Sequence, residues 1–400
     1  MPDGSDMKGM TGPSMSHAMH GMYAPPVDTH SLLTAWPVSP VSMVAVAGAV
    51  WLGHRALVTW RGTPRSPSWL SFAILAAIAW LVGLRWAVAT PHGSPFGYAM
   101  LLVEVTAASC YLTGVRRLST KGRSWPAFRT ATFLSGLVMI ALALQSPVSS
   151  LVASSFEYHV VQHMLLMVVA APLLALSAPM TLALQTTSHP TKVILLKVLN
   201  SRTFAVITFP ATVWFLYYGV MFAFFLTPLL GYAMNHMVLM DALNILFLLG
   251  GCNFWWPTIG LDHNPRWKMT HGMRIINLLI GVPFESFLGI ALLGGGAAAS
   301  IYTPAQTHVG GGMVWAIGEM SAFVGTAIVM VQWARDDQRV ALREDRRTIA
   351  RQRLARLREA QADAGTEAPV EVASATSAFE EAYLARGIPV PVTLADDYRS

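Results

Sequence analysis

The stretch YHVVQHMLLMVVAAPLLALSAPMTLAL, residues 158–184, runs for 27 residues without an Asp, Glu, Lys or Arg. A helix of about 20 mostly apolar residues is enough to cross the hydrocarbon core of a bilayer, so this stretch predicts a transmembrane helix. Eight other stretches have the same character. The predicted spans are residues 39–58, 69–88, 96–115, 130–148, 158–184, 204–226, 232–252, 273–293 and 313–333. The sequence therefore predicts an all-α, polytopic membrane helix bundle with nine transmembrane helices.

The composition of the whole chain agrees with a membrane protein. Of 400 residues, 54% are hydrophobic and only 12% are charged, whereas about a quarter of the residues are charged in an ordinary soluble domain. This low charge excludes a soluble enzyme with a polar shell. Cys110 and Cys252 are the only two cysteines, which excludes a disulfide framework and a CxxC site.

The basic residues predict how the chain is oriented. All of the 27 Lys and Arg residues except Lys8 and Arg85 lie near or beyond the C-terminal end of the first, third, fifth, seventh or ninth predicted span. Because cytoplasmic loops are enriched in Lys and Arg, we expect the N-terminus outside and the C-terminus in the cytoplasm. This distribution also explains the net charge of +6, so no nucleic-acid partner is predicted, and the lipid bilayer is the expected surroundings.

The pattern divides the chain into four predicted regions. Residues 1–38 form an extracytoplasmic tail rich in Met and His, and residues 39–333 form the transmembrane bundle. Residues 334–362 are predicted to be a cytoplasmic helix, whose arginines suit anionic lipid headgroups. Residues 363–400 are acidic and rich in Ala, Pro, Ser and Thr, which predicts disorder.

Ionisable side chains inside a bilayer are costly and are by default functional candidates. With the predicted orientation, nearly all of them fall in the outer half of the membrane. They are Arg85, Glu104, Glu157, His159, His163, His236, Asp241, Glu285 and Glu319. We expect Arg85, Glu104, Glu285 and Glu319 to pair with one another. A transport pathway needs polar groups through the whole bilayer, so this distribution favours a site open to the outside.

Histidines and methionines at helical spacing indicate a metal site. His159, His163 and Met167 are spaced i, i+4, i+8 and share one face of a helix. His236 and Met240, in a later span, are also one turn apart. Imidazole and thioether ligands without a thiolate suit copper, especially Cu(I). The alternatives are histidines that bond a neighbouring helix and methionines that only fill the core.

The N-terminal tail carries the same kinds of ligand on the predicted outer side. Its candidate ligands are Met15, His17, Met19, His20 and Met22. Such a tail can bind copper weakly and pass it on by ligand exchange. The alternative is a low-complexity tail without a role.

Several of these residues lie in motifs that resemble a known family. They are His159-x-x-Gln162-His163-Met164, Ala171-Pro172-Leu173-Leu174, Ala178-Pro179, Asn235-His236-Met237, Phe254-Trp255-Trp256-Pro257, and Arg274 leading into Pro283-Phe284-Glu285-Ser286-Phe287-Leu288-Gly289. Over residues 31–333 the chain resembles the multi-span CtaG family of bacterial caa-type cytochrome c oxidase assembly factors. The tail and the arginine-rich C-terminus lie outside this resemblance.

The resemblance implies a non-enzymatic protein of the bacterial cell membrane that matures cytochrome c oxidase. It implies that the partner is the catalytic subunit of the oxidase, which would receive copper from this protein. On this interpretation His159, His163 and His236 handle the metal. Two alternatives are a b-type cytochrome with His163 and His236 as axial haem ligands, and a copper permease, which would need ligands in the inner half of the membrane.

Overall fold

The computed structural model describes residues 36–40, 42–48, 50–51, 94–262 and 269–363. All regular structure within these residues is helical, with no strand. The chain divides into two compact units, residues 1–326 and residues 327–400. The candidate site lies entirely in the first unit.

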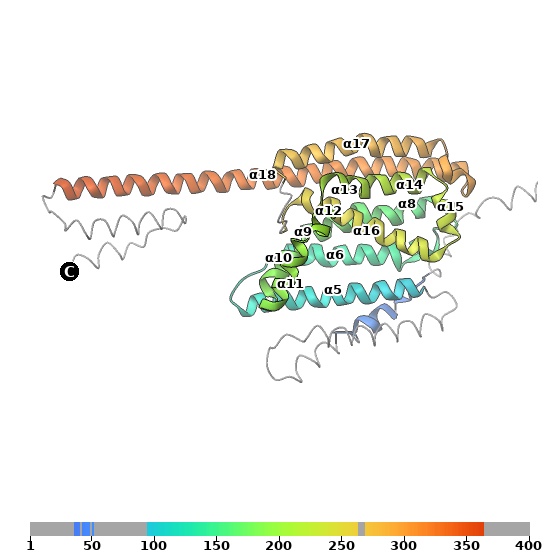
Figure 1. Ribbon diagram of the computed structural model, residues 1–400, viewed down its shortest axis with the longest axis horizontal. Coiled ribbons are helices and arrows are strands. Elements are labelled where there is room, and N and C mark those ends of the chain that lie inside the picture. The colour runs from blue at the N-terminus through green and yellow to red at the C-terminus, as the bar shows by residue number, and fades with distance from the viewer. Residues whose placement is uncertain (1–35, 41, 49, 52–93, 263–268, 364–400) are drawn as a thin grey trace, which may run out of the picture. The chain divides into compact units, whose positions relative to one another are not determined.

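The helices follow one another closely along the chain (Figure 1). They are α5 (Pro95–Thr120), α6 (Ala127–Leu144), α7 (Pro147–Ser150), α8 (Phe156–Met164), the π-helix η1 (Leu165–Ala170), α9 (Ala171–Leu176), α10 (Pro179–Thr186), α11 (His189–Leu199), α12 (Arg202–Ile207), α13 (Pro210–Trp214), the π-helix η2 (Phe215–Gly219), α14 (Val220–Leu226), α15 (Leu229–Met234), α16 (Met237–Ile259), α17 (His271–Leu293), the 3₁₀-helix η3 (Gly296–Ser300) and α18 (Pro304–Asp363).

Six of the predicted spans are confirmed as helices that are long and apolar enough to cross a membrane. Within the described residues these helices are Pro95–Thr120, Ala127–Ser150, Phe156–Thr186, Met237–Ile259, His271–Leu293 and Pro304–Glu359. A shorter apolar helix, Pro210–Leu226, lies in the predicted span 204–226. The span predicted at 69–88 and most of the N-terminal tail lie outside the described residues.

Two predicted spans contain breaks in the structure. In span 158–184 the chain turns at Ala178, whose φ of 50° is left-handed, and α10 starts at the following proline. Asp262 stabilises this start by accepting hydrogen bonds from the backbone N–H groups of Met180 (2.8 Å) and Thr181 (2.5 Å). In span 204–226 the break precedes Pro210, because a proline disfavours helical geometry in the residue before it.

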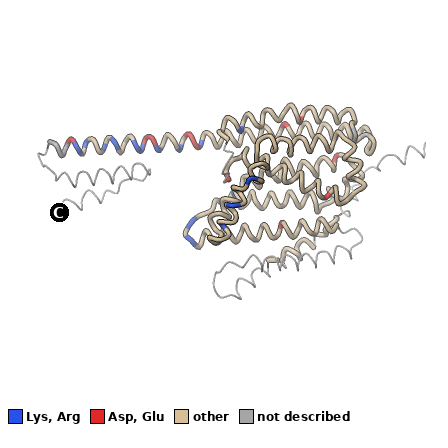
Figure 2. The backbone as a smooth tube through the Cα atoms, in the orientation of Figure 1, with Lys and Arg blue, Asp and Glu red and all other residues tan. Residues whose placement is uncertain are grey.

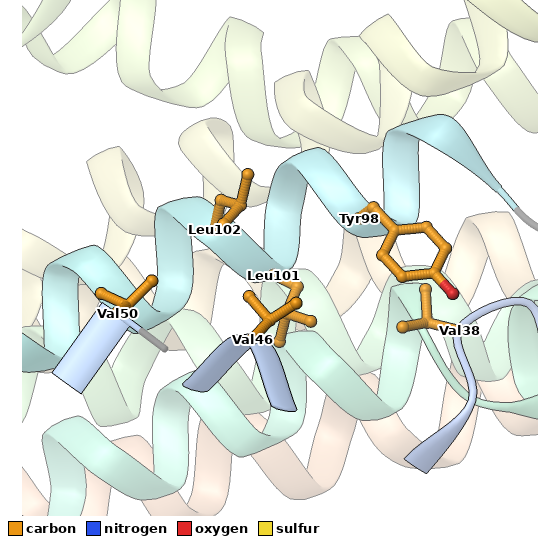
Figure 3. Close-up of a cluster of buried hydrophobic side chains, with 6 residues drawn as sticks. All are labelled: Val38, Val46, Val50, Tyr98, Leu101 and Leu102. Atoms are coloured by element: carbon orange, nitrogen blue, oxygen red, sulfur yellow. The ribbon is translucent and has the colours of Figure 1, made fainter. Parts of the chain in front are cut away.

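The segment formed by α8, η1 and α9 is central in the first unit. It packs against α6 on one side and α16 on the other, while α5 packs against α6 and α10. Near the N-terminus, residues 36–40, 42–48 and 50–51 include a helical segment that packs on α5. Their contact is an apolar cluster of Val38, Val46, Val50, Tyr98, Leu101 and Leu102 (Figure 3).

Basic residues gather at one end of these helices. Figure 2 shows the Lys and Arg residues of the loop between α5 and α6 at the same end as those of α11. Because α6 runs from this basic loop to the opposite end, α7 and the start of α8 lie away from it. His159, in the first turns of α8, is therefore near the end of α6 opposite the basic loop.

Candidate metal centre

The two histidines of α8 lie side by side in the core of the first unit. His159 and His163 are one helical turn apart, and their ring centroids are 4.9 Å apart. Both side chains are 0% exposed. Because α8 continues into the segment between α6 and α16, its face carrying both rings is enclosed by protein.

Aromatic rings from two other helices surround His163. Its ring centroid is 4.9 Å from that of Phe224 and 5.9 Å from that of Phe225, both on α14. Phe247 of α16 is nearer, at 4.3 Å. A haem ligated by His163 would have to displace some of these rings.

The side chain of His159 has a single hydrogen-bond partner in the described part of the chain. Its Nδ1 lies 2.9 Å from the hydroxyl oxygen of Tyr302, which follows η3. The same hydroxyl donates a hydrogen bond of 2.6 Å to the carbonyl oxygen of Val152. Nothing in the sequence signals this contact, because 143 residues separate His159 from Tyr302.

Three imidazole nitrogens of the pair remain without a partner among the described residues. They are Nε2 of His159 and both Nδ1 and Nε2 of His163. Buried polar atoms are nearly always hydrogen-bonded, and a neutral imidazole offers one lone pair for a metal. Each of the two imidazoles therefore has a nitrogen lone pair that could bind a metal, and both rings lie in an enclosed, apolar region.

Met167, the third member of the predicted stripe, is fully buried but lies in the π-helix η1. Hydrogen bonds in a π-helix connect residues i and i+5, so side chains after Leu165 are rotated relative to a regular α-helix. The carbonyl oxygen of Met167 accepts a hydrogen bond of 3.1 Å from Nε1 of Trp255. The regular i, i+4, i+8 face expected from the sequence thus ends at His163.

The structure does not bring His236 into a group with the α8 pair. His236 is exposed, and its ring stacks on Tyr232 at a centroid distance of 4.0 Å. Within the described residues, no three or more His, Cys, Asp or Glu side chains are grouped to hold a metal ion. Met240 is half-buried on α16. The tail ligands Met15, His17, Met19, His20 and Met22 lie outside the described residues.

Of the acidic residues expected to pair with one another, Glu285 and Glu319 are close enough to interact electrostatically. Other groups donate hydrogen bonds to Glu104 and Glu319. Glu104 accepts a hydrogen bond of 2.9 Å from Nε2 of Gln145. Glu319 accepts hydrogen bonds from Ser286 and Trp315. Arg85, the expected basic partner, lies outside the described residues.

Comparison with known proteins identifies relatives for most of this region. Uncharacterized proteins of Mycobacterium leprae, Mycobacterium bovis and Mycobacterium tuberculosis are each 31% identical to it, over 59%, 60% and 60% of this chain. The matches cover 38%, 39% and 39% of those proteins, so the chain spans about two fifths of the length of the curated relatives it matches. No solved structure matches the chain.

The family model that matches describes the cytochrome c oxidase caa3 assembly factor and covers residues 109–336. This range includes both histidines of α8, Tyr302 and the four long apolar helices from Ala127 to Leu293. It extends over more than half of the 400 residues. The resemblance seen in the sequence motifs is thereby confirmed, and the chain belongs to the family of cytochrome c oxidase caa3 assembly factors.

Proposed function

We propose that the protein is a non-catalytic assembly factor of a caa3-type cytochrome c oxidase, and that it holds Cu(I) at His159 and His163 before passing it to an oxidase subunit. The observation that supports the copper site is the buried imidazole pair with its three unpartnered nitrogens. Family membership supports the oxidase as the partner.

The chemistry of the site favours Cu(I) over a divalent ion. Imidazole is a good ligand for copper and zinc alike. The preference between Cu(I) and a divalent ion therefore depends on the charge of the ion. No acidic side chain is grouped with the pair among the described residues. Since an uncompensated charge is costly in an apolar region, a monovalent ion on two neutral imidazoles is less unfavourable there than a divalent ion.

The proposal also includes a route for the metal. We take the chain to have nine spans with the N-terminus outside, so that the histidine pair lies near the outer membrane face. The tail residues Met15–Met22 collect Cu(I), and exposed His236 with half-buried Met240 forms an intermediate binding site. In support, the sulfur of Met234, two residues before His236, is 3.9 Å from the Tyr302 hydroxyl that contacts His159.

The test measures Cu(I) binding and oxidase maturation in the same variants. We expect purified protein to retain Cu(I) against a competing chelator, and His159→Ala/His163→Ala to lose this binding. His159→Gln/His163→Phe is a second double variant, which fills the volume and suits the aromatic surroundings. His308→Ala, at an exposed position, is the matched control and should bind normally.

In cells, both double variants should insert into the membrane and lower the copper content of the oxidase. Normal copper loading of the oxidase in cells that contain an inserted double variant would refute the copper role. A reduced-minus-oxidised spectrum with haem bands would indicate a cytochrome instead, and copper uptake into vesicles containing only this protein would indicate a permease.

A further inference from the structure

The hydroxyl group of Tyr302 contacts Nδ1 of His159 and two groups that can only accept a hydrogen bond, the carbonyl oxygen of Val152 and, more distantly, the sulfur of Met234 at 3.9 Å. The carbonyl oxygen of Val152, 2.6 Å away, can only accept a hydrogen bond, so the single hydroxyl proton points to it. The hydroxyl oxygen then accepts from Nδ1 of His159 at 2.9 Å. Nδ1 must therefore carry a proton, and in neutral His159 the lone pair is on Nε2.

We infer that Tyr302 is a positioning residue that holds His159 in the tautomer with a free Nε2 lone pair, ready to bind metal. The metal part of this inference rests on the proposed function, whereas the tautomer part rests on the hydrogen bonds alone. A partner on the second nitrogen of a metal-binding histidine commonly fixes its tautomer and ring orientation.

Tyr302 is itself firmly placed for this role. Its side chain is 0% exposed, and its ring centroid is 5.1 Å from that of Phe156 at the start of α8. Its backbone N–H donates to the carbonyl oxygen of Ala298 at 2.9 Å. Burial, with a contribution from Glu157, raises the pKa of Tyr302 above its ordinary value, so the hydroxyl keeps the proton it donates.

The two histidines therefore differ in how strongly their surroundings fix the tautomer of the ring before a metal binds. Tyr302 fixes the tautomer of His159, while neither nitrogen of His163 has a partner among the described residues. A metal that reaches the pair meets the Nε2 lone pair of His159, which is already fixed in place. It also meets the imidazole of His163, which can change its tautomer. A single preset ligand fits a site that must both accept and release its ion.

The direct test is nitrogen-15 NMR of the histidine side chains in the metal-free protein. The His159 signals are assigned as those missing from His159→Gln. We expect a protonated Nδ1 and an unprotonated Nε2 in the wild type. We expect Tyr302→Phe, which removes only the hydroxyl, to show both tautomers.

Tyr111→Phe is a closely matched control. The Tyr111 hydroxyl also donates to a buried carbonyl, that of Ser177 at 2.9 Å, and accepts from a ring N–H, that of Trp125 at 3.0 Å. The two variants thus lose equivalent hydrogen bonds. Tyr111→Phe should leave the His159 tautomer unchanged.

Copper binding provides the second measurement. Loss of a residue that orients a metal ligand typically weakens binding by about 10- to 100-fold, so we expect this reduction in Cu(I) affinity for Tyr302→Phe and none for Tyr111→Phe. A wild-type His159 protonated on Nε2, or equal Cu(I) affinity in the two variants, would overturn the inference. Absence of Cu(I) binding in a wild type with protonated Nδ1 would refute the proposed function and still support the Tyr302 tautomer assignment.

Discussion

At the scale of single residues, buried polar side chains in the long apolar helices form hydrogen bonds with specific partners. Glu104 on α5 is buried, and its Oε1 is bonded to the amide of Gln145, just after α6. Gln162 of α8 donates to the carbonyl oxygen of Ala143 on α6 at 3.1 Å. These bonds link α5 and α8 to the same end of α6, near the histidine pair.

The bond between Glu104 and Gln145 predicts different effects for two substitutions. Glu104→Ala leaves the buried Gln145 amide without its partner and should lower the free energy of unfolding by about 1 kcal/mol. Glu104→Gln keeps an acceptor oxygen at the same position and should cost less. Thermal unfolding of the purified protein in detergent measures both, and equal losses would show that the hydrogen bond is unimportant.

The histidine pair also shows what residue-level patterns can predict. The i, i+4 spacing places His159 and His163 side by side because neighbours on one helix are determined locally. The mutual pairing expected for the acidic residues depends on contacts between helices. Glu319 of α18 interacts with Glu285 of α17, whereas Glu104 bonds Gln145.

At the scale of helices, the contact between α16 and η1 organises the centre of the bundle. A Cβ atom at Gly251 would lie 2.9 Å from Cα of Met167 and 3.0 Å from its carbonyl oxygen. One turn later, Trp255 donates its indole hydrogen bond to that same carbonyl. Glycine therefore permits the close approach, and the tryptophan stabilises the π-helix beside it.

Gly251→Ala should be destabilising because the added methyl group meets backbone atoms that cannot move aside. We expect a loss of about 1–3 kcal/mol, as for other overpacked cores. Gly312→Ala in α18 is the control, since nothing lies within 4 Å of a Cβ there. Replacing a helical glycine in open space should stabilise by about 0.5–1 kcal/mol. Similar unfolding temperatures for the two variants would contradict this account of the contact.

Helix boundaries were predictable only where the chain itself marks them. Pro95 marks the start of α5 directly, and hydropathy located the six helices that are long and apolar enough to cross a membrane. The predicted span 232–252 instead begins as α16 at Met237, after a turn at Asn235 and His236. Hydropathy alone does not register such a turn, since apolar residues continue on both sides of it.

At the scale of the whole molecule, the position of the basic residues indicates which end of the bundle faces the cytoplasm. Lys and Arg of the α5–α6 loop and of α11 lie at one end (Figure 2), and the histidine pair lies toward the other. If the basic end is cytoplasmic, an ion at the pair is accessible to partners outside the cell.

This orientation predicts the labelling of single cysteines introduced at opposite ends. Ala153 and Ser124 are both exposed, before α8 and in the α5–α6 loop. In a protein whose Cys110 and Cys252 are replaced by serine, Ala153→Cys should react with a membrane-impermeant maleimide in intact cells. Ser124→Cys should react only after permeabilisation. The reverse result would place the histidine pair on the cytoplasmic side and exclude delivery by an external tail.

The sequence by itself determined six of the long apolar helices, the gathering of the basic residues of the α5–α6 loop and α11, and the adjacency of His159 and His163. These properties depend on local hydropathy, charge and helical period, which the chain carries without reference to its other parts. Only the tertiary structure decided that Tyr302 reaches His159, that phenylalanines of α14 and α16 enclose His163, and that His236 lies apart. Those contacts depend on the path of the loops and the packing of helices distant in sequence, which no local pattern specifies.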